Sequence, residues 1–126
     1  MISSAMLYAG SIIITIWGLA HLTIPTKRIV DGFGPITEDN KRILLMEWLM
    51  EGILLVFLGS IVAVVRTLAP ADEFAPTIVY RASAVVLIIM AGVSVVTGAR
   101  TRIAPMRLCP LIFLATAVLF WIPTVF

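Results

Sequence analysis

Charged residues are scarce in this chain: they make up 13% of its 126 residues, whereas 61% of the residues are hydrophobic. Soluble domains are usually about 25% charged and about 45–50% apolar. A single small core cannot hide so many apolar side chains, and the mean hydropathy of +1.13 indicates that a lipid bilayer solvates most of them. The length predicts one domain, residues 1–126.

Cysteine is almost absent, and several functional signatures are missing. The single cysteine, Cys109, excludes an intramolecular disulfide. The sequence has no glycine-rich phosphate loop, no Ser/His/Asp arrangement and no paired Cys or His with zinc spacing, so an enzyme is the least favoured class. The net charge of +2 comes without a basic patch that carries interleaved aromatic residues, which excludes nucleic acid as a partner.

Four long apolar segments are present instead, at 3–24, 43–65, 77–98 and 108–126. Each is close to the ~20 residues that an α-helix needs to cross the hydrocarbon core, and none alternates in polarity as a barrel strand does. The first segment has no basic residues before it, so we interpret it as a retained span and not a signal peptide. The prediction is an all-α, polytopic membrane protein: an antiparallel bundle of four transmembrane helices.

Capping residues and prolines predict where the helices begin. Thr37 is a candidate N-cap, followed by Glu38 and Asp39 in the first turn, so the second helix should start before the membrane and run for about 28 residues. Pro76 fits the first turn of the third helix, and Pro110 the first turn of the fourth.

The basic residues predict the orientation. All but two of the nine lie in or beside the first and third loops: Lys27, Arg28, Lys41, Arg42, Arg100, Arg102 and Arg107. The positive-inside rule then places these loops in the cytoplasm and both termini outside, in the cytoplasmic (inner) membrane. By the preference of aromatic residues for membrane interfaces, Trp48 should lie at the inner one.

Small residues recur at helical spacing, including Ser11 with Gly18 and Gly52 with Gly59. Such residues let helix backbones approach closely in lipid. Packing inside the bundle is the favoured interpretation, and a homo-oligomer interface is the alternative.

Two carboxylates interrupt the second span, and they define the candidate site. Glu47 and Glu51 are four residues apart, on one helix face, and polar groups in such segments usually face the bundle or water. His21 lies toward the same end of the first span, which predicts an imidazole–carboxylate pair with Glu47. Trp17 lies one turn from His21 on the same face.

Cys109 should lie in the same leaflet as His21 and the two carboxylates. One interpretation is a structural polar cluster that pins the first helix to the second. Another is a small-molecule, quinone, lipid or proton-coupled site, and a third is a metal or haem site, since His, Glu and Cys are all metal ligands. The residues do not identify a cofactor.

Three segments resemble the DoxX-like group of small four-helix membrane proteins: "GLAHLTIP" (18–25), "EGILLVFLG" (51–59) and "AVVLIIMAG" (84–92). His21 stands where a lysine is usual in that group. The resemblance implies an accessory membrane subunit. Some members of that group are associated with thiol or quinone redox systems. The favoured function is a non-catalytic accessory or assembly subunit, with a homo-oligomer or another membrane protein as partner. The alternative is a ligand or transport site built on His21, Glu47 and Glu51.

Overall fold

The computed structural model describes residues 2–23, 30–69 and 74–126, and it contains the four predicted helices. They are α1 (Ile2–Thr23), α3 (Glu38–Leu68), α4 (Phe74–Val96) and α5 (Ala104–Trp121), with short 3-10 helices at Gly98–Arg100 and Ile122–Thr124. Each long helix is long and apolar enough to cross a membrane. The predicted all-α membrane bundle is therefore confirmed. Lys27 and Arg28 of the first loop lie outside the described residues.

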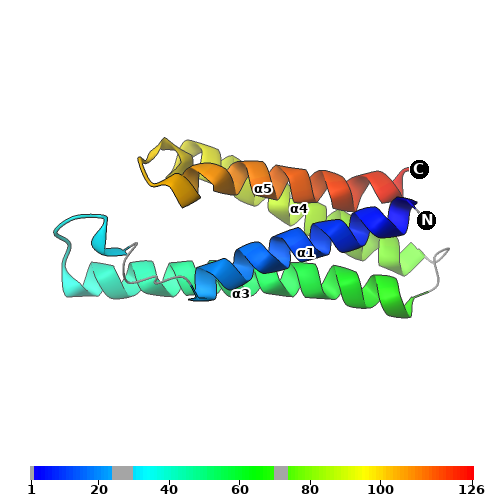
Figure 1. Ribbon diagram of the computed structural model, residues 1–126, viewed down its shortest axis with the longest axis horizontal. Coiled ribbons are helices and arrows are strands. Elements are labelled where there is room, and N and C mark those ends of the chain that lie inside the picture. The colour runs from blue at the N-terminus through cyan, green and yellow to red at the C-terminus, as the bar shows by residue number, and fades with distance from the viewer. Residues whose placement is uncertain (1, 24–29, 70–73) are drawn as a thin grey trace.

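The helices form an elongated antiparallel bundle with both termini at one end (Figure 1). We call this the terminal end, and the opposite end, where α1 stops and α3 starts, the loop end. Helix α1 packs along α3, α5 packs along α4, and α1 also contacts α5. Helices α3 and α4 touch each other much less. The bundle is thus two helix pairs joined mainly through α1 and α5.

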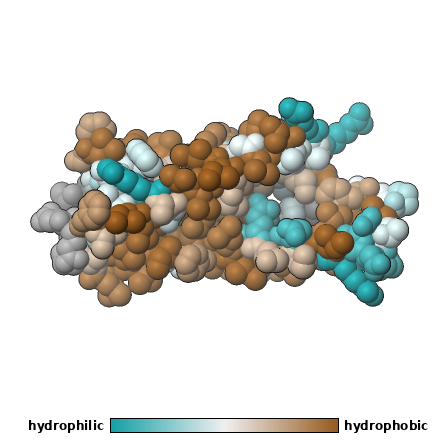
Figure 2. Space-filling view, turned by 180° about the vertical axis from the view of Figure 1, so that it is seen from behind, coloured by the Kyte–Doolittle hydropathy of each residue, from teal (hydrophilic) through white to brown (hydrophobic). Residues whose placement is uncertain are grey.

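Apolar side chains fill the centre of the bundle and also cover its outside. The centre is formed by fully buried side chains from all four helices: Ile14, Leu55, Leu87 and Phe113. Large apolar side chains are also exposed on every long helix: Ile12, Ile53, Ile89 and Leu111 are examples. The predominantly apolar surface is visible in Figure 2. Such an exterior is suited to contact with lipid tails.

Glycines bring α1 and α3 together. A Cβ atom added to Gly18 would lie 2.8 Å from the backbone oxygen of Gly52, and one added to Gly59 would overlap the side chain of Thr15 and the backbone of Ser11. No larger residue fits at these positions without moving a helix. The small residues therefore pack inside the bundle, as the favoured interpretation of their spacing predicted.

The start of α3 agrees with its sequence signals. The hydroxyl of Thr37 accepts a hydrogen bond from the backbone N–H of Asn40 at 3.2 Å, which confirms the predicted N-cap. The helix that follows has 31 residues, slightly more than expected. Pro76 is the third residue of α4, also as predicted.

The predicted start of the last helix was wrong. Helix α5 begins at Ala104, with Pro105 in its first turn, so Pro110 lies inside the helix. Pro105 satisfies the preference for proline at a helix start, where its missing N–H costs nothing. Pro110 has no N–H to donate to the carbonyl of Met106 one turn earlier, so the helical hydrogen-bond ladder is interrupted there.

Candidate functional site

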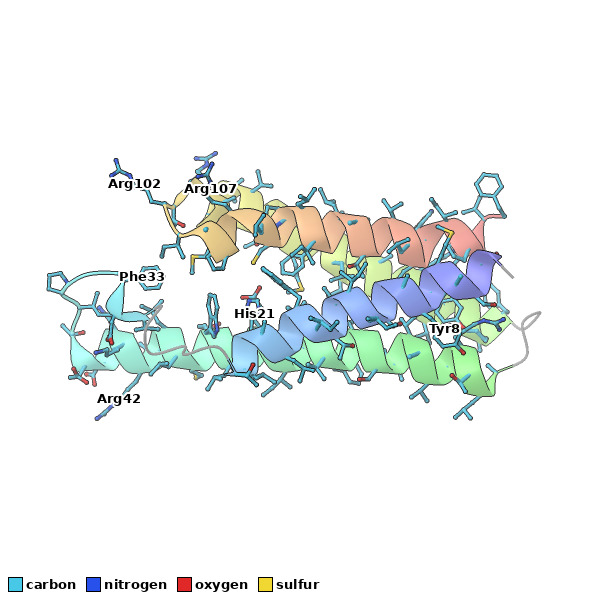
Figure 3. The ribbon with its side chains drawn as sticks, viewed as in Figure 1. Tyr8, His21, Phe33, Arg42, Arg102 and Arg107 are labelled. Atoms are coloured by element: carbon cyan, nitrogen blue, oxygen red, sulfur yellow. The ribbon has the colours of Figure 1, made fainter. Side chains whose placement is uncertain are left out.

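His21 lies near the end of α1 and points into the bundle at the loop end (Figure 3). Only 2% of its surface is exposed. Its Nδ1 lies 2.8 Å from the backbone carbonyl oxygen of Trp17. A carbonyl oxygen can only accept, so Nδ1 carries a proton and donates this bond. In the neutral ring, Nε2 is then the nitrogen that offers a lone pair.

Two indole rings hold the imidazole in place. Trp17 contacts His21 edge-on with ring centroids 5.7 Å apart, and Trp48 stacks on it at 4.5 Å. The indole N–H of Trp48 also donates to the backbone carbonyl of His21 at 3.0 Å. Trp48 is only 8% exposed, so it is part of the buried site, and its place at the inner membrane interface stays a prediction.

The structure pairs His21 with Glu51 and not with Glu47. The Nε2 of His21 lies 3.9 Å from the Oε1 of Glu51, whereas Glu47 is exposed. The pairing follows from where α1 and α3 touch. A Cβ added to Gly52 would lie 2.9 Å from the Cβ of His21. Glu51, the residue next to Gly52, is therefore close enough to reach the imidazole. Glu47 lies about 6 Å farther along the axis of α3, toward the loop end.

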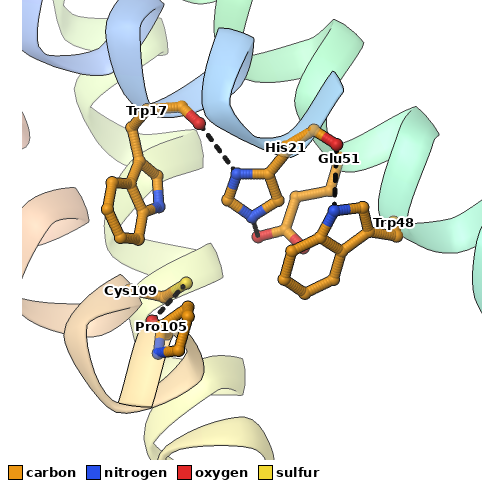
Figure 4. A network of polar contacts seen from close by, with 6 residues as sticks. All are labelled: Trp17, His21, Trp48, Glu51, Pro105 and Cys109. Atoms are coloured by element: carbon orange, nitrogen blue, oxygen red, sulfur yellow. Dashed lines mark hydrogen bonds and ion pairs between the residues drawn. The ribbon is translucent and has the colours of Figure 1, made fainter. Parts of the chain in front are cut away.

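Cys109 completes the cluster from a third helix. It is buried on α5, and its thiol donates a hydrogen bond to the carbonyl of Pro105 at 3.4 Å. The potential ligand atoms of His21, Glu51 and Cys109 all lie within 4.8 Å of one another. Figure 4 shows the three side chains converging from α1, α3 and α5. We refer to them as the His21–Glu51–Cys109 cluster.

A cavity of about 340 Å³ adjoins this cluster between α3, α4 and α5. We call it the α3–α4 cavity. Its polar lining comes from Glu51, Ser94, Thr97 and Cys109, and apolar residues such as Phe113 supply most of the remaining wall. On the face seen in Figure 2, the apolar surface is interrupted by a hollow beside a hydrophilic patch. The cavity thus combines an apolar wall with a few polar groups near the cluster.

A second cavity, of about 270 Å³, lies at the same end of the bundle. Its lining includes Trp17, His21, Trp48 and Pro105. The cluster and its aromatic neighbours therefore adjoin two cavities.

Of the residues predicted for the site, the structure brings together Trp17, His21 and Glu51, and leaves Glu47 on the surface. The role of Trp48 was not predicted from the sequence. The signal was present, because Trp48 precedes Glu51 by three residues and so shares its helix face.

Comparison with family models, with curated proteins and with solved structures finds no match to the chain. The resemblance to the DoxX-like group consequently rests on the three quoted segments alone.

Proposed function

We propose that this membrane protein is non-catalytic and binds a small, largely apolar molecule, of quinone or lipid type, in the α3–α4 cavity. A volume of about 340 Å³ is within the range of small-molecule sites, which are mostly apolar with a few polar groups that orient the ligand. A carbonyl or hydroxyl group of the ligand would reach the polar wall at Glu51, Ser94 and Thr97, while its apolar part contacts α4 and α5.

The observation that carries this proposal is the position of Glu51. A carboxylate that served only to pin α1 to α3 would be enclosed between those helices. Glu51 faces His21 on one side, yet 31% of its side chain is exposed and it lines the cavity. Ionisable groups inside a membrane span are costly and usually mark a binding or transport pathway.

Native mass spectrometry of the protein in mild detergent tests the proposal. We expect wild type to retain a reproducible bound mass, and Glu51→Gln to lose most of it. The matched control is Glu47→Gln, which makes the same chemical change one turn away on the exposed surface of α3. It should keep the bound mass.

Two results would contradict ligand binding: no bound mass on wild type, or equal losses in both variants. The accessory or assembly role suggested by the DoxX-like segments would then be the better account. The search would move to protein partners or to a second copy of the chain.

We further propose that the loop end faces the cytoplasm, with both termini outside the cytoplasmic membrane. The exposed basic residues of the described loop end support this: Arg42, Arg100, Arg102 and Arg107. Three of them are labelled in Figure 3. At the terminal end, Arg66 and Arg81 are engaged in hydrogen bonds with Ser4 and Thr124. A C-terminal fluorescent fusion that matures only in the cytoplasm should stay dark, and a bright fusion would reverse the orientation.

A further inference from the structure

We propose that the His21–Glu51–Cys109 cluster is a binding site for one zinc-like divalent metal ion. The proposal goes beyond small-molecule binding, because it needs no occupant in the α3–α4 cavity. It rests on the donor set, its geometry and its charge.

The donor set favours zinc over magnesium or calcium. An imidazole nitrogen, a carboxylate oxygen and a thiolate sulfur are all established zinc ligands. Hard cations such as Mg²⁺ and Ca²⁺ prefer sites built from oxygen atoms alone. The single cysteine is therefore the residue that decides the class of metal.

The geometry needs only a small closure. Ligand atoms in a tetrahedral zinc site with bonds of about 2.0–2.3 Å lie about 3.3–3.7 Å from one another. In this structure the Nε2 of His21 and the Oε1 of Glu51 are 3.9 Å apart, and all three ligand atoms lie within 4.8 Å. To surround one ion, the three ligand atoms would have to move closer to one another by up to about 1.5 Å.

The imidazole is already oriented as a ligand. Metal-binding histidines almost always donate their other ring N–H to a carbonyl or carboxylate, which fixes the tautomer. His21 has this arrangement, because its Nδ1–H donates to the Trp17 carbonyl and its Nε2 is directed toward Glu51. The stacked ring of Trp48 restrains rotation of the imidazole.

The charges balance in a way that suits an apolar environment. A divalent ion, the Glu51 carboxylate, the Cys109 thiolate and a neutral His21 sum to zero. Burying a net charge among apolar helices would be far more costly. Binding releases the thiol proton of Cys109 to the medium. Glu51 and Cys109 both line the α3–α4 cavity, so a fourth ligand to the ion would come from that side.

Cobalt(II) is the probe for the first experiment, because zinc itself has no visible absorption. Wild type, stripped with a chelator and titrated with Co²⁺ alone, should take up one ion per chain and show a sulfur-to-cobalt charge-transfer band. Cys109→Ser should lose the band. Glu51→Gln should weaken binding at least about tenfold, whereas Glu47→Gln should behave as wild type.

The proposal is overturned if wild type shows no charge-transfer band, or if Glu47→Gln weakens binding as much as Glu51→Gln. Should a variant fail to fold, X-ray absorption at the zinc edge decides on wild type alone. One sulfur at about 2.3 Å from zinc is expected, and a shell of nitrogen and oxygen only would exclude the site.

The metal site and the proposed small-molecule function can fail separately. Val93 lines the α3–α4 cavity but is not one of the three proposed metal ligands, so Val93→Phe should lose the bound mass and keep the cobalt band. A bound mass without a cobalt band leaves small-molecule binding intact and removes the metal. A cobalt band without a bound mass larger than that of a metal ion does the opposite.

Discussion

On one side of α3 the backbone of α1 lies so close that no side chain fits at Gly18 or Gly59, whereas on the other side α4 leaves a cavity of about 340 Å³. In lipid, burial of apolar side chains gives little attraction between helices, so close packing must supply it. We infer that the α1–α3 side provides stability and the α3–α4 side provides space for a ligand. In this protein of four helices, close packing and the cavity proposed for the ligand thus both involve α3.

The largest effect on stability is expected where α1 and α3 touch. Gly59→Ala should lower the free energy of unfolding by about 1–3 kcal/mol, because the added methyl group overlaps Thr15 and the Ser11 backbone. Unfolding by a denaturing detergent, followed by circular dichroism, measures this loss. Gly92→Ala on α4 is the matched control, since nothing lies within 4 Å of its added Cβ. If both variants lost the same free energy of unfolding, the close contact of α1 with α3 would not be the source of the stability.

A smaller loss is expected from the hydrogen bond between the same two helices. Trp48→Phe keeps an aromatic ring against His21 but removes the N–H that donates to the His21 carbonyl. That carbonyl is in the last turn of α1, where no helical N–H is available to it. The expected cost is about 1 kcal/mol, visible as a lower Tm in detergent. Trp121→Phe, at the exposed terminal end, should change stability by less than about 0.5 kcal/mol.

The smallest change in stability is expected on the open side of α3. Val93→Phe places a larger side chain in the α3–α4 cavity, so the free energy of unfolding should stay within about 0.5 kcal/mol of wild type. The bound mass should nevertheless fall at least about tenfold. Val95→Phe, on an exposed part of α4 away from the cavity, should leave both quantities unchanged. If Val93→Phe lost much stability and Val95→Phe did not, the cavity would have no room for the larger side chain, and the prediction would be wrong.

The sequence was sufficient to predict the helices, because each long apolar run has only one way to satisfy its backbone in lipid. It also located the cap at Thr37. Pro110 was misplaced because two prolines, five residues apart, both suit a helix start, and the sequence does not say which one is used.

The pairing of His21 could not be predicted from spacing. It depends on where α1 and α3 cross, and that point is set by the contact of Gly18 with the backbone of Gly52. A shift of one helical turn in this crossing would exchange Glu51 for Glu47. The contribution of Cys109 from α5 depends on a third helix, whose distance from the others no periodicity reveals.

Ile89 and Val93 line the α3–α4 cavity while more than half of each side chain remains exposed on the bundle's apolar exterior. We infer that the proposed ligand enters through this apolar wall, from the acyl chains, and so dissolves in the bilayer before it meets Glu51. Its occupancy then follows its mole fraction in the lipid, so partitioning comes before recognition. Each added methylene raises that partitioning by about 0.8 kcal/mol, roughly fourfold, even if it makes no contact with the protein.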